Sequence, residues 1–133
     1  MKRRKPSDME MQILGLLWEN GPMTARQVLE AMPDGKKRAY TSVLSVLQVM
    51  EKKALLTHTD RGNAHVYSPA VGKSEIMRPF MRRLVDNLFG GQPHAMMQAL
   101  LSETAPNPEE LRRIRQVLDA LEAAPKSPGE RSL

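Results

Sequence analysis

Apolar residues recur at helical spacing in three short segments of the first half of the chain. The segments are Met9–Trp18, Val28–Met32 and Val43–Met50, and each can place its apolar side chains on one helix face. The patterns Ser-x-x-Glu at Ser7 and Thr-x-x-Gln at Thr24 are those of capping boxes, which open helices. The sequence therefore predicts three helices.

The third predicted helix, Tyr40–Lys53, has two faces of opposite character. One face is apolar and is expected to pack on a core, and its members are Val43, Val46, Leu47 and Met50. The other face carries polar or basic side chains at the same period, and its members are Thr41, Ser45, Gln48 and Lys52. Such a helix packs with one face and offers the other to solvent or to a ligand.

After this helix the pattern changes to that of a β-hairpin. Leu55–Thr59 and Ala64–Ser68 are rich in β-forming residues, and they flank Asp60–Asn63, a strong turn signal. Three helices followed by a hairpin is the order of a winged helix-turn-helix domain. The predicted fold class is therefore mainly α with a small β-hairpin wing that carries Arg61 at its tip.

From Ser74 onward the pattern is purely helical. A broad apolar stripe ends at Gly90-Gly91, and a further helix follows Pro93. Asn107-Pro108-Glu109-Glu110 is the pattern of a helix start, with asparagine as the cap and proline in the first position. If Ser74 caps the first of these helices, Pro79 should kink it or delay its start.

These patterns predict a winged-helix DNA-binding domain over residues 1–72 and a helical dimerisation domain over 73–122. Residues 123–133 are expected to form a disordered tail. Three short helices with so much apolar surface cannot fold alone as a monomer. They must pack on the first domain or on another copy of themselves, and a site for twofold DNA would favour the second option. The residues assigned to dimerisation are Phe80, Leu84, Leu88, Phe89, Met96, Leu100, Leu111, Ile114, Leu118 and Leu121.

Composition narrows the choice of partner and compartment. The net charge is +5, and 12 of the 20 Lys and Arg residues lie within residues 1–75, which favours an anionic partner for the first domain. The chain has no cysteine, which excludes disulfides and thiolate metal sites and permits a reducing cytoplasm. No apolar run approaches the ~20 residues of a membrane span, and the basic start is not followed by the apolar segment of a signal peptide. A cytoplasmic protein without membrane insertion is expected.

No catalytic site is predicted, because the chain lacks a glycine-rich phosphate loop, a Gly-x-Ser-x-Gly elbow and a helical His-Glu-x-x-His. If the hairpin closes around Arg61-Gly62, His58 pairs with His65 across the strands. Two facing imidazoles could hold a metal ion, but no carboxylate or thiol of suitable spacing is expected to complete four ligands. The favoured interpretation is two exposed histidines near phosphates, so neither a metal nor a cofactor is predicted.

Double-stranded DNA is the partner that the first domain favours. The major groove, ~12 Å wide, admits one α-helix, and hydrogen-bonding side chains read the base edges there. The predicted DNA-binding residues come from the third helix, the basic loop before it and the wing: Lys36, Lys37, Arg38, Tyr40, Thr41, Ser42, Ser45, Gln48, Lys52 and Arg61. The alternative is a winged-helix module whose third helix docks a protein; the basic loop and the nearly acid-free helix face argue against it.

The combined motifs resemble those of the penicillinase repressor family, of the BlaI/MecI type. The resemblance spans roughly Ser7 to Leu121. It rests on Tyr40–Gln48, Glu51–Leu56, Arg61-Gly62 and Val66–Pro69, and it is supported by Glu10–Trp18, Thr24–Val28 and Leu88–Gly91. It implies a homodimeric winged-helix transcriptional repressor that binds a palindromic operator and dimerises through its C-terminal helices.

The resemblance also implies a mode of release. In one branch of the family a membrane sensor peptidase, acting on a cell-wall or β-lactam signal, leads to cleavage of the repressor at an Asn-Phe bond in the dimerisation region. Ala99-Leu100 stands at the corresponding place in this chain, so Ala99 and Leu100 are the candidate cleavage residues. A different peptidase specificity or a direct effector are the open alternatives.

Overall fold

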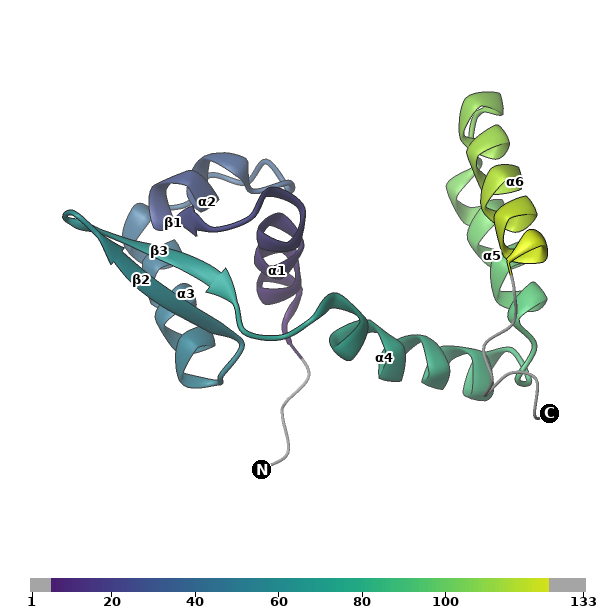
Figure 1. Ribbon diagram of the computed structural model, residues 1–133, viewed down its shortest axis with the longest axis horizontal. Helices are drawn as coiled ribbons and strands as arrows, with labels where there is room; N and C mark the ends of the chain where they lie inside the picture. The colour runs from purple at the N-terminus through teal and green to yellow at the C-terminus, as the bar shows by residue number, and fades with distance from the viewer. Residues whose placement is uncertain (1–5, 125–133) are drawn as a thin grey trace. The chain divides into compact units, whose positions relative to one another are not determined.

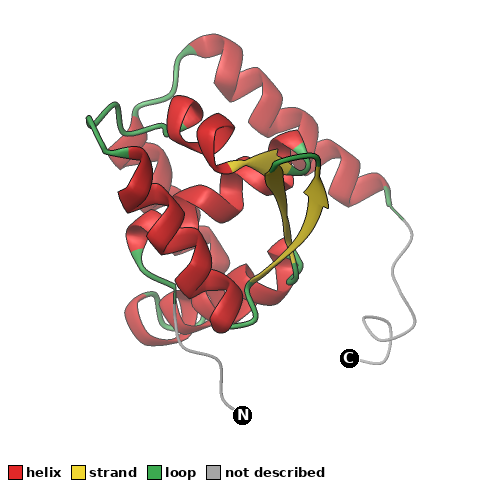
Figure 2. Cartoon of the chain, turned by 90° about the vertical axis from the view of Figure 1, so that its left-hand side faces the viewer, coloured by secondary structure: helices red, strands yellow, loops and turns green. Residues whose placement is uncertain are grey.

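The computed structural model describes residues 6–124, which hold six helices and three strands. Figure 1 labels these elements, and Figure 2 colours them by type. The chain divides into two compact units, residues 1–81 and 82–133, and the division falls inside helix α4. Helix α4 therefore contributes residues to both units.

The first unit contains three helices and a small sheet. Its elements in chain order are α1 (Asp8–Asn20), β1 (Met23–Thr24), α2 (Ala25–Ala31), α3 (Tyr40–Lys52), β2 (Leu56–Arg61) and β3 (Ala64–Pro69), followed by the start of α4 (Lys73–Leu88). Both predicted capping boxes are confirmed, with Ser7 opening α1 and Thr24 opening α2. This is the winged helix-turn-helix order that the sequence predicts.

The sheet has three strands, whereas the sequence indicated only the hairpin. Its order is β1-β3-β2, and both pairings are antiparallel. β1 was missed because two residues are too few to show the alternation that marks a strand. It matters to the fold because Met23 pairs with Tyr67 and thereby ties the start of α2 to the hairpin.

The predicted register of the hairpin was wrong. The two-residue turn is Gly62-Asn63, with Arg61 opposite Ala64, so His58 faces Tyr67 and not His65. The physical reason is Gly62, which adopts a φ of +64°. The first position of a two-residue hairpin turn requires a positive φ, which glycine adopts readily. A turn at Arg61-Gly62 would have placed an arginine in that position.

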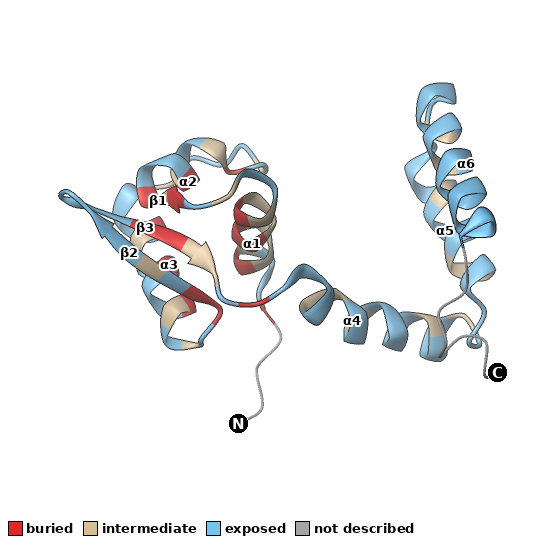
Figure 3. Cartoon of the chain, in the orientation of Figure 1, coloured by how far each residue is buried: buried red, intermediate tan, exposed pale blue. Residues whose placement is uncertain are grey.

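The core of the first unit lies between the three helices and the sheet, as the buried segments in Figure 3 show. The predicted apolar face of α3 is part of it, since Val43, Leu47 and Met50 are fully buried. Trp18 at the end of α1 donates its indole Nε1–H to the carbonyl of Val71 at 3.0 Å. This bond secures the segment that leads from β3 into α4.

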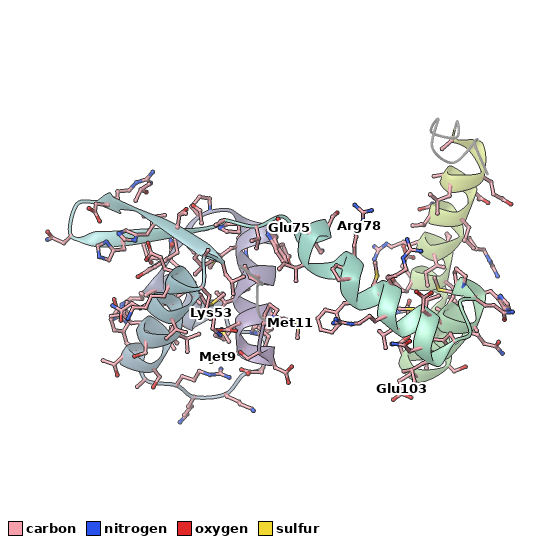
Figure 4. The ribbon with its side chains drawn as sticks, turned by 90° about the horizontal axis from the view of Figure 1, so that it is seen from below. Met9, Met11, Lys53, Glu75, Arg78 and Glu103 are labelled. Carbon is pink, nitrogen blue, oxygen red and sulfur yellow. The ribbon has the colours of Figure 1, made fainter. Side chains whose placement is uncertain are left out.

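A nearly buried ion pair connects α1 to the end of α3. Glu10 is 4% exposed, and Lys53 Nζ lies 2.9 Å from its Oε2; Figure 4 shows the Lys53 side chain reaching toward α1. Burial alone would raise the pKa of Glu10, but the hydrogen bond from the Ser7 backbone and the Lys53 ammonium lower it, and the net pKa lies below its ordinary value. The pair therefore favours an ionised carboxylate inside the fold.

The second unit contains the end of α4, α5 (Pro93–Thr104) and α6 (Pro108–Ala123). The predicted start of α6 is confirmed, because Asn107 accepts a hydrogen bond from the Glu110 N–H at 2.8 Å. No residue of α4, α5 or α6 is buried within the single chain, which is visible in Figure 3 as the absence of buried segments along these helices.

The start of α4 differs from the expectation drawn from the sequence. Ser74 is not the cap of α4, because the helix begins at Lys73 and the Gly72 N–H is bound by the Glu75 carboxylate; Pro79 lies inside the helix and does not delay its start. Most of the tail predicted for residues 123–133 lies outside the described residues, and Ala123 still belongs to α6. Over residues 6–124, no helix combines the length and apolar character needed to cross a membrane.

Ala54, two residues after the end of α3, has an unfavourable conformation, which allows a test of stability. Its φ is +64°, a region in which a side chain costs roughly 1–2 kcal/mol and which glycine adopts freely. We expect Ala54→Gly to raise the free energy of unfolding by about 1 kcal/mol, measured by denaturation followed through Trp18 fluorescence. Ala70→Gly, at an exposed residue without a positive φ, is the control and should not stabilise; an equal gain there would contradict the explanation.

Candidate nucleic-acid interface

The predicted polar face of α3 is exposed in the structure. Thr41, Ser42, Ser45, Gln48 and Lys52 are all accessible, while the opposite side of the same helix is fully buried in the core. The core contacts therefore fix the rotation of α3, and the exposed face is presented without any need for the fold to rearrange. None of its members is acidic.

The basic loop before α3 is less uniform than its sequence suggests. Lys36 and Lys37 are exposed, but Arg38 is half-buried and makes a two-pronged contact with Asp34, with Nη1 2.7 Å from Oδ1. The Arg38 guanidinium holds the pKa of the Asp34 carboxyl well below its ordinary value, with further help from the Lys36 backbone N–H. Arg38 therefore shapes the loop, and the two lysines supply its exposed positive charge.

Arg26 belongs to the same surface and was missed by sequence reasoning. It lies on α2 with its guanidinium carbon 5.0 Å from the centre of the Tyr40 ring, a distance typical of a cation–π contact. Tyr40, at the first position of α3, is 39% exposed. The sequence signal for Arg26 was only its place in the capping-box segment Thr24–Gln27, because 13 residues lie between it and Tyr40 in the chain.

The wing projects from the helices of the first unit (Figure 1). Arg61 is exposed and is the last residue of β2, directly before the Gly62-Asn63 turn, which places it near the tip as predicted. Glu51 on α3 is bound to His58 on β2, with 2.7 Å between Oε2 and Nδ1. This contact joins the base of the wing to α3, and it pairs the carboxylate of Glu51 with the imidazole of His58.

The wing histidines have the carboxylate of Asp60 beside them. Asp60 Oδ1 lies 2.6 Å from His65 Nδ1 and 3.8 Å from His58 Nε2, because the true register brings Asp60 opposite His65. The two histidine rings also lie together, with centroids 4.3 Å apart, although they are not paired across the strands. The wing therefore carries a cluster of two imidazoles and one carboxylate.

The residues assigned to dimerisation fall into two groups in the structure. Phe80, Phe89, Met96, Leu111 and Ile114 are half-buried within the chain, whereas Leu84, Leu88, Leu100, Leu118 and Leu121 are exposed. Exposed Met97 and Val117 extend the second group and were not predicted. Ala99 and Leu100, the candidate cleavage residues, are exposed within the helical segment of α5.

The architecture and the exposed face of α3 define a class of protein. Three helices and a hairpin wing, with a polar, non-acidic helix face between a basic loop and a wing arginine, are the features of a winged-helix DNA-binding protein. Comparison with known protein families identifies the family within that class.

The model of the penicillinase repressor family matches residues 6–120, and the chain belongs to this family. The transcriptional regulator BlaI of Mycobacterium tuberculosis is 35% identical to it over 101 residues, which are 75% of this chain and 71% of the relative, in strains CDC 1551 / Oshkosh and ATCC 25618 / H37Rv alike. The family consists of transcriptional repressors and not of enzymes. The chain is therefore a DNA-binding transcriptional repressor, as the resemblance predicted.

One solved structure is similar to part of the chain. It is the solution structure of the monomeric form of Bacillus licheniformis BlaI in complex with the blaP half-operator. The match has a TM-score of 0.47 and 22% sequence identity, and it covers 56% of this chain and 90% of that chain.

Proposed function

We propose that the chain is a sequence-specific repressor that binds a palindromic operator as a homodimer in the cytoplasm, without a cofactor. The observation that carries the proposal is the exposed face of α3, which offers hydroxyl and amide groups on a helix whose other side is held by the core. Short hydrogen-bonding side chains on one helix are suited to reading base edges in the major groove.

In this proposal the elements of the first unit have separate tasks. Thr41, Ser42, Ser45 and Gln48 on α3 contact base edges, and Lys52 and Tyr40 contact the sugar-phosphate backbone at the two ends of the helix. Lys36, Lys37 and the wing residue Arg61 bind phosphates, which set register and supply affinity without sequence information. Arg38 acts indirectly, through its ion pair with Asp34. Occupied DNA then excludes polymerase.

The homodimer is inferred from uncovered apolar surface in the second unit. Leu88 is 71% exposed, Leu121 is 68% exposed and Val117 is 59% exposed, and large apolar patches on a single chain mark interaction sites. The groove between α5 and α6, lined by Met97, Leu100, Ile114 and Val117 among others, belongs to the same surface. A second copy of residues 73–122 would cover it and would place two α3 helices on two half-sites.

A salt titration on random duplex DNA tests the class of function directly. A protein that neutralises phosphates loses affinity steeply as salt concentration rises, and we expect that behaviour from the full chain. The alternative, a module whose α3 face docks a protein, predicts no measurable binding to random duplex at low salt.

Base reading and phosphate binding can be separated by substitution. We expect Gln48→Ala and Ser45→Ala to lose ~1–3 kcal/mol at the cognate base while leaving binding to scrambled DNA unchanged. Lys37→Ala should weaken binding to both DNAs alike. Binding is measured by fluorescence anisotropy on an operator and on its scrambled version. Equal losses on both DNAs from Gln48→Ala would remove that residue from base reading.

Release from DNA is proposed to act through the second unit. A cut at Ala99–Leu100 would lie inside α5, so a peptidase, such as one controlled by a membrane sensor, must first open the helix locally. The cut would separate α6 from α4 and lower operator affinity without changing α3. We expect intact-mass analysis of the repressor from induced cells to show a break between Met96 and Ser102. Derepression with the whole 133-residue chain intact would favour a direct effector and contradict the proposed cut.

A further inference from the structure

Three side chains that can bind a metal ion lie together on one face of the wing. His58 and Asp60 are two residues apart on β2, and His65 on β3 is opposite Asp60, so the period of the strands places all three on the same face. One ligand atom from each residue lies within 4.8 Å of the others. The cluster is on the opposite face of β2 from Thr57, Thr59 and Arg61, which alternate with its members.

The distances are close to those of a coordinated set. Asp60 Oδ1 lies 2.6 Å from His65 Nδ1 and 3.8 Å from His58 Nε2. In a tetrahedral zinc site with bonds of about 2.0 Å, neighbouring ligand atoms are about 3.3 Å apart. The two distances lie on either side of that separation, and all three ligand atoms lie within 4.8 Å of one another.

Glu51 prepares His58 for this role from outside the wing. Its Oε2 lies 2.7 Å from His58 Nδ1, and a neutral imidazole that donates its Nδ1–H keeps its lone pair on Nε2, the nitrogen nearer Asp60. A carboxylate behind a histidine in this way orients the ring and raises its basicity toward a metal ion. Because Glu51 belongs to α3, which packs on the core of the first unit, the core holds Glu51 in place beside His58.

The surroundings leave three protein ligands and one open position. Tyr67 lies beside the cluster, with its ring centre 5.8 Å from that of His58, and is buried in the core of the unit. The exposed side chains of Asp60 and His65 leave room for a water molecule as the fourth ligand. Two imidazoles, a carboxylate and a water form a donor set that suits zinc.

We infer that the wing binds one zinc ion through His58, Asp60 and His65, with Glu51 as a positioning residue. This differs from the expectation drawn from the sequence, which predicted no metal. The site lies on the face of β2 opposite Arg61, so a bound ion would add positive charge to the wing but not to the Arg61 face that is proposed to bind phosphates. Zinc binding is measurable without DNA and does not rest on the proposed function.

The test is calorimetric titration of the full, metal-stripped chain with zinc chloride. We expect one zinc ion per chain, and we expect His65→Ala to weaken zinc affinity at least tenfold. His65 is 52% exposed in its side chain, so this variant keeps the fold. His94→Ala removes a histidine at the start of α5, in the other unit, and is the matched control, with unchanged affinity.

The role of Glu51 is tested by two variants and a spectrum. Glu51→Gln keeps an acceptor for His58 and should weaken zinc binding less than tenfold, whereas Glu51→Ala should weaken it 10–100-fold. With Co²⁺ as the probe, both variants should alter the visible absorption bands that report coordination, which a merely structural role would leave unchanged. The inference is overturned if the wild-type chain shows no saturable one-to-one zinc binding, if His65→Ala binds as well as wild type, or if His94→Ala loses affinity equally.

Discussion

Leu118→Asp is expected to convert the full-length repressor from a dimer to a monomer and to weaken operator binding about 100-fold or more. Leu118 is 50% exposed on α6 in the single chain, so an aspartate there costs the isolated subunit little. In the proposed dimer the same side chain is covered by the partner, where an unpaired charge is expensive. Linked half-sites raise overall affinity by roughly 10²–10⁴, and that gain is what a monomer loses.

A charge of the same sign at a neighbouring position provides the control. Gln116→Glu lies on the same helix at an exposed residue outside the apolar set and should leave both assembly and operator affinity unchanged. Sedimentation at micromolar concentration reports the assembly, and anisotropy with operator DNA reports affinity. A wild-type chain that sediments as a monomer would refute the proposed dimer.

Lys53→Met is expected to lower the free energy of unfolding of the first unit by about 2 kcal/mol. The substitution leaves the Glu10 carboxylate, which is 4% exposed, without its ammonium partner. Breaking a fully buried ion pair costs roughly 3–5 kcal/mol; a smaller loss is expected here because the Lys53 side chain is 34% exposed. Trp18, the single tryptophan, reports the unfolding of this unit.

Two controls isolate the pair from other effects of the substitution. Lys52→Met, at the neighbouring exposed residue, should change stability by less than ~0.5 kcal/mol. The double variant Glu10→Gln, Lys53→Met removes the stranded charge and should regain about half of the loss. If the double variant is less stable than the sum of the two single losses predicts, the explanation by an unpaired carboxylate is wrong.

The same pair predicts how stability depends on pH. The pKa of Glu10 is lower in the folded chain than its ordinary value of 4.5, so the unfolded chain binds the proton more readily. The contribution of Glu10 is therefore fully present above about pH 4.5 and is lost as pH falls through the lower pKa of the folded state. Glu10→Gln should show a flatter decline of stability in that range.

The helices of the first unit could be predicted because local signals agree with the packing. Ser7 and Thr24 cap helices whose apolar residues are correctly spaced, and the helical spacing of Val43, Leu47 and Met50 is enough to mark the buried face of α3. Where local preference and burial point to the same answer, the sequence pattern is sufficient.

The features that sequence reasoning missed depend on how the strands pair. β1 is only two residues long and is defined by its pairing with Tyr67 and Val66. The hairpin register depends on which turn position receives glycine, and the position of Asp60 relative to His65 follows from that choice. A register error of this kind changes every cross-strand neighbour, and it placed His58 opposite His65, where the structure has Asp60.

The candidate DNA interface also contains a part that the sequence predicts and a part that it does not. The polar face of α3 follows from helical period alone, whereas the charges around it depend on partners. In the sequence Arg38 follows Lys36 and Lys37 and was predicted to bind DNA with them, but in the structure it is bound to Asp34. Arg26 belongs to the surface because it contacts Tyr40 on another helix. Side-chain pairing of this kind leaves no periodic trace in the sequence.

The central claim is that the chain is a dimeric repressor whose two α3 helices read a DNA sequence with twofold symmetry. Sequencing the genomic fragments bound by the full-length chain tests this claim most directly. The account predicts a small set of fragments that share an inverted repeat, with half-site centres about 10–10.5 base pairs or a multiple of that apart. Gln48→Ala should recover fragments in which one position of each half-site is relaxed. Wild-type fragments without any shared sequence would contradict the account.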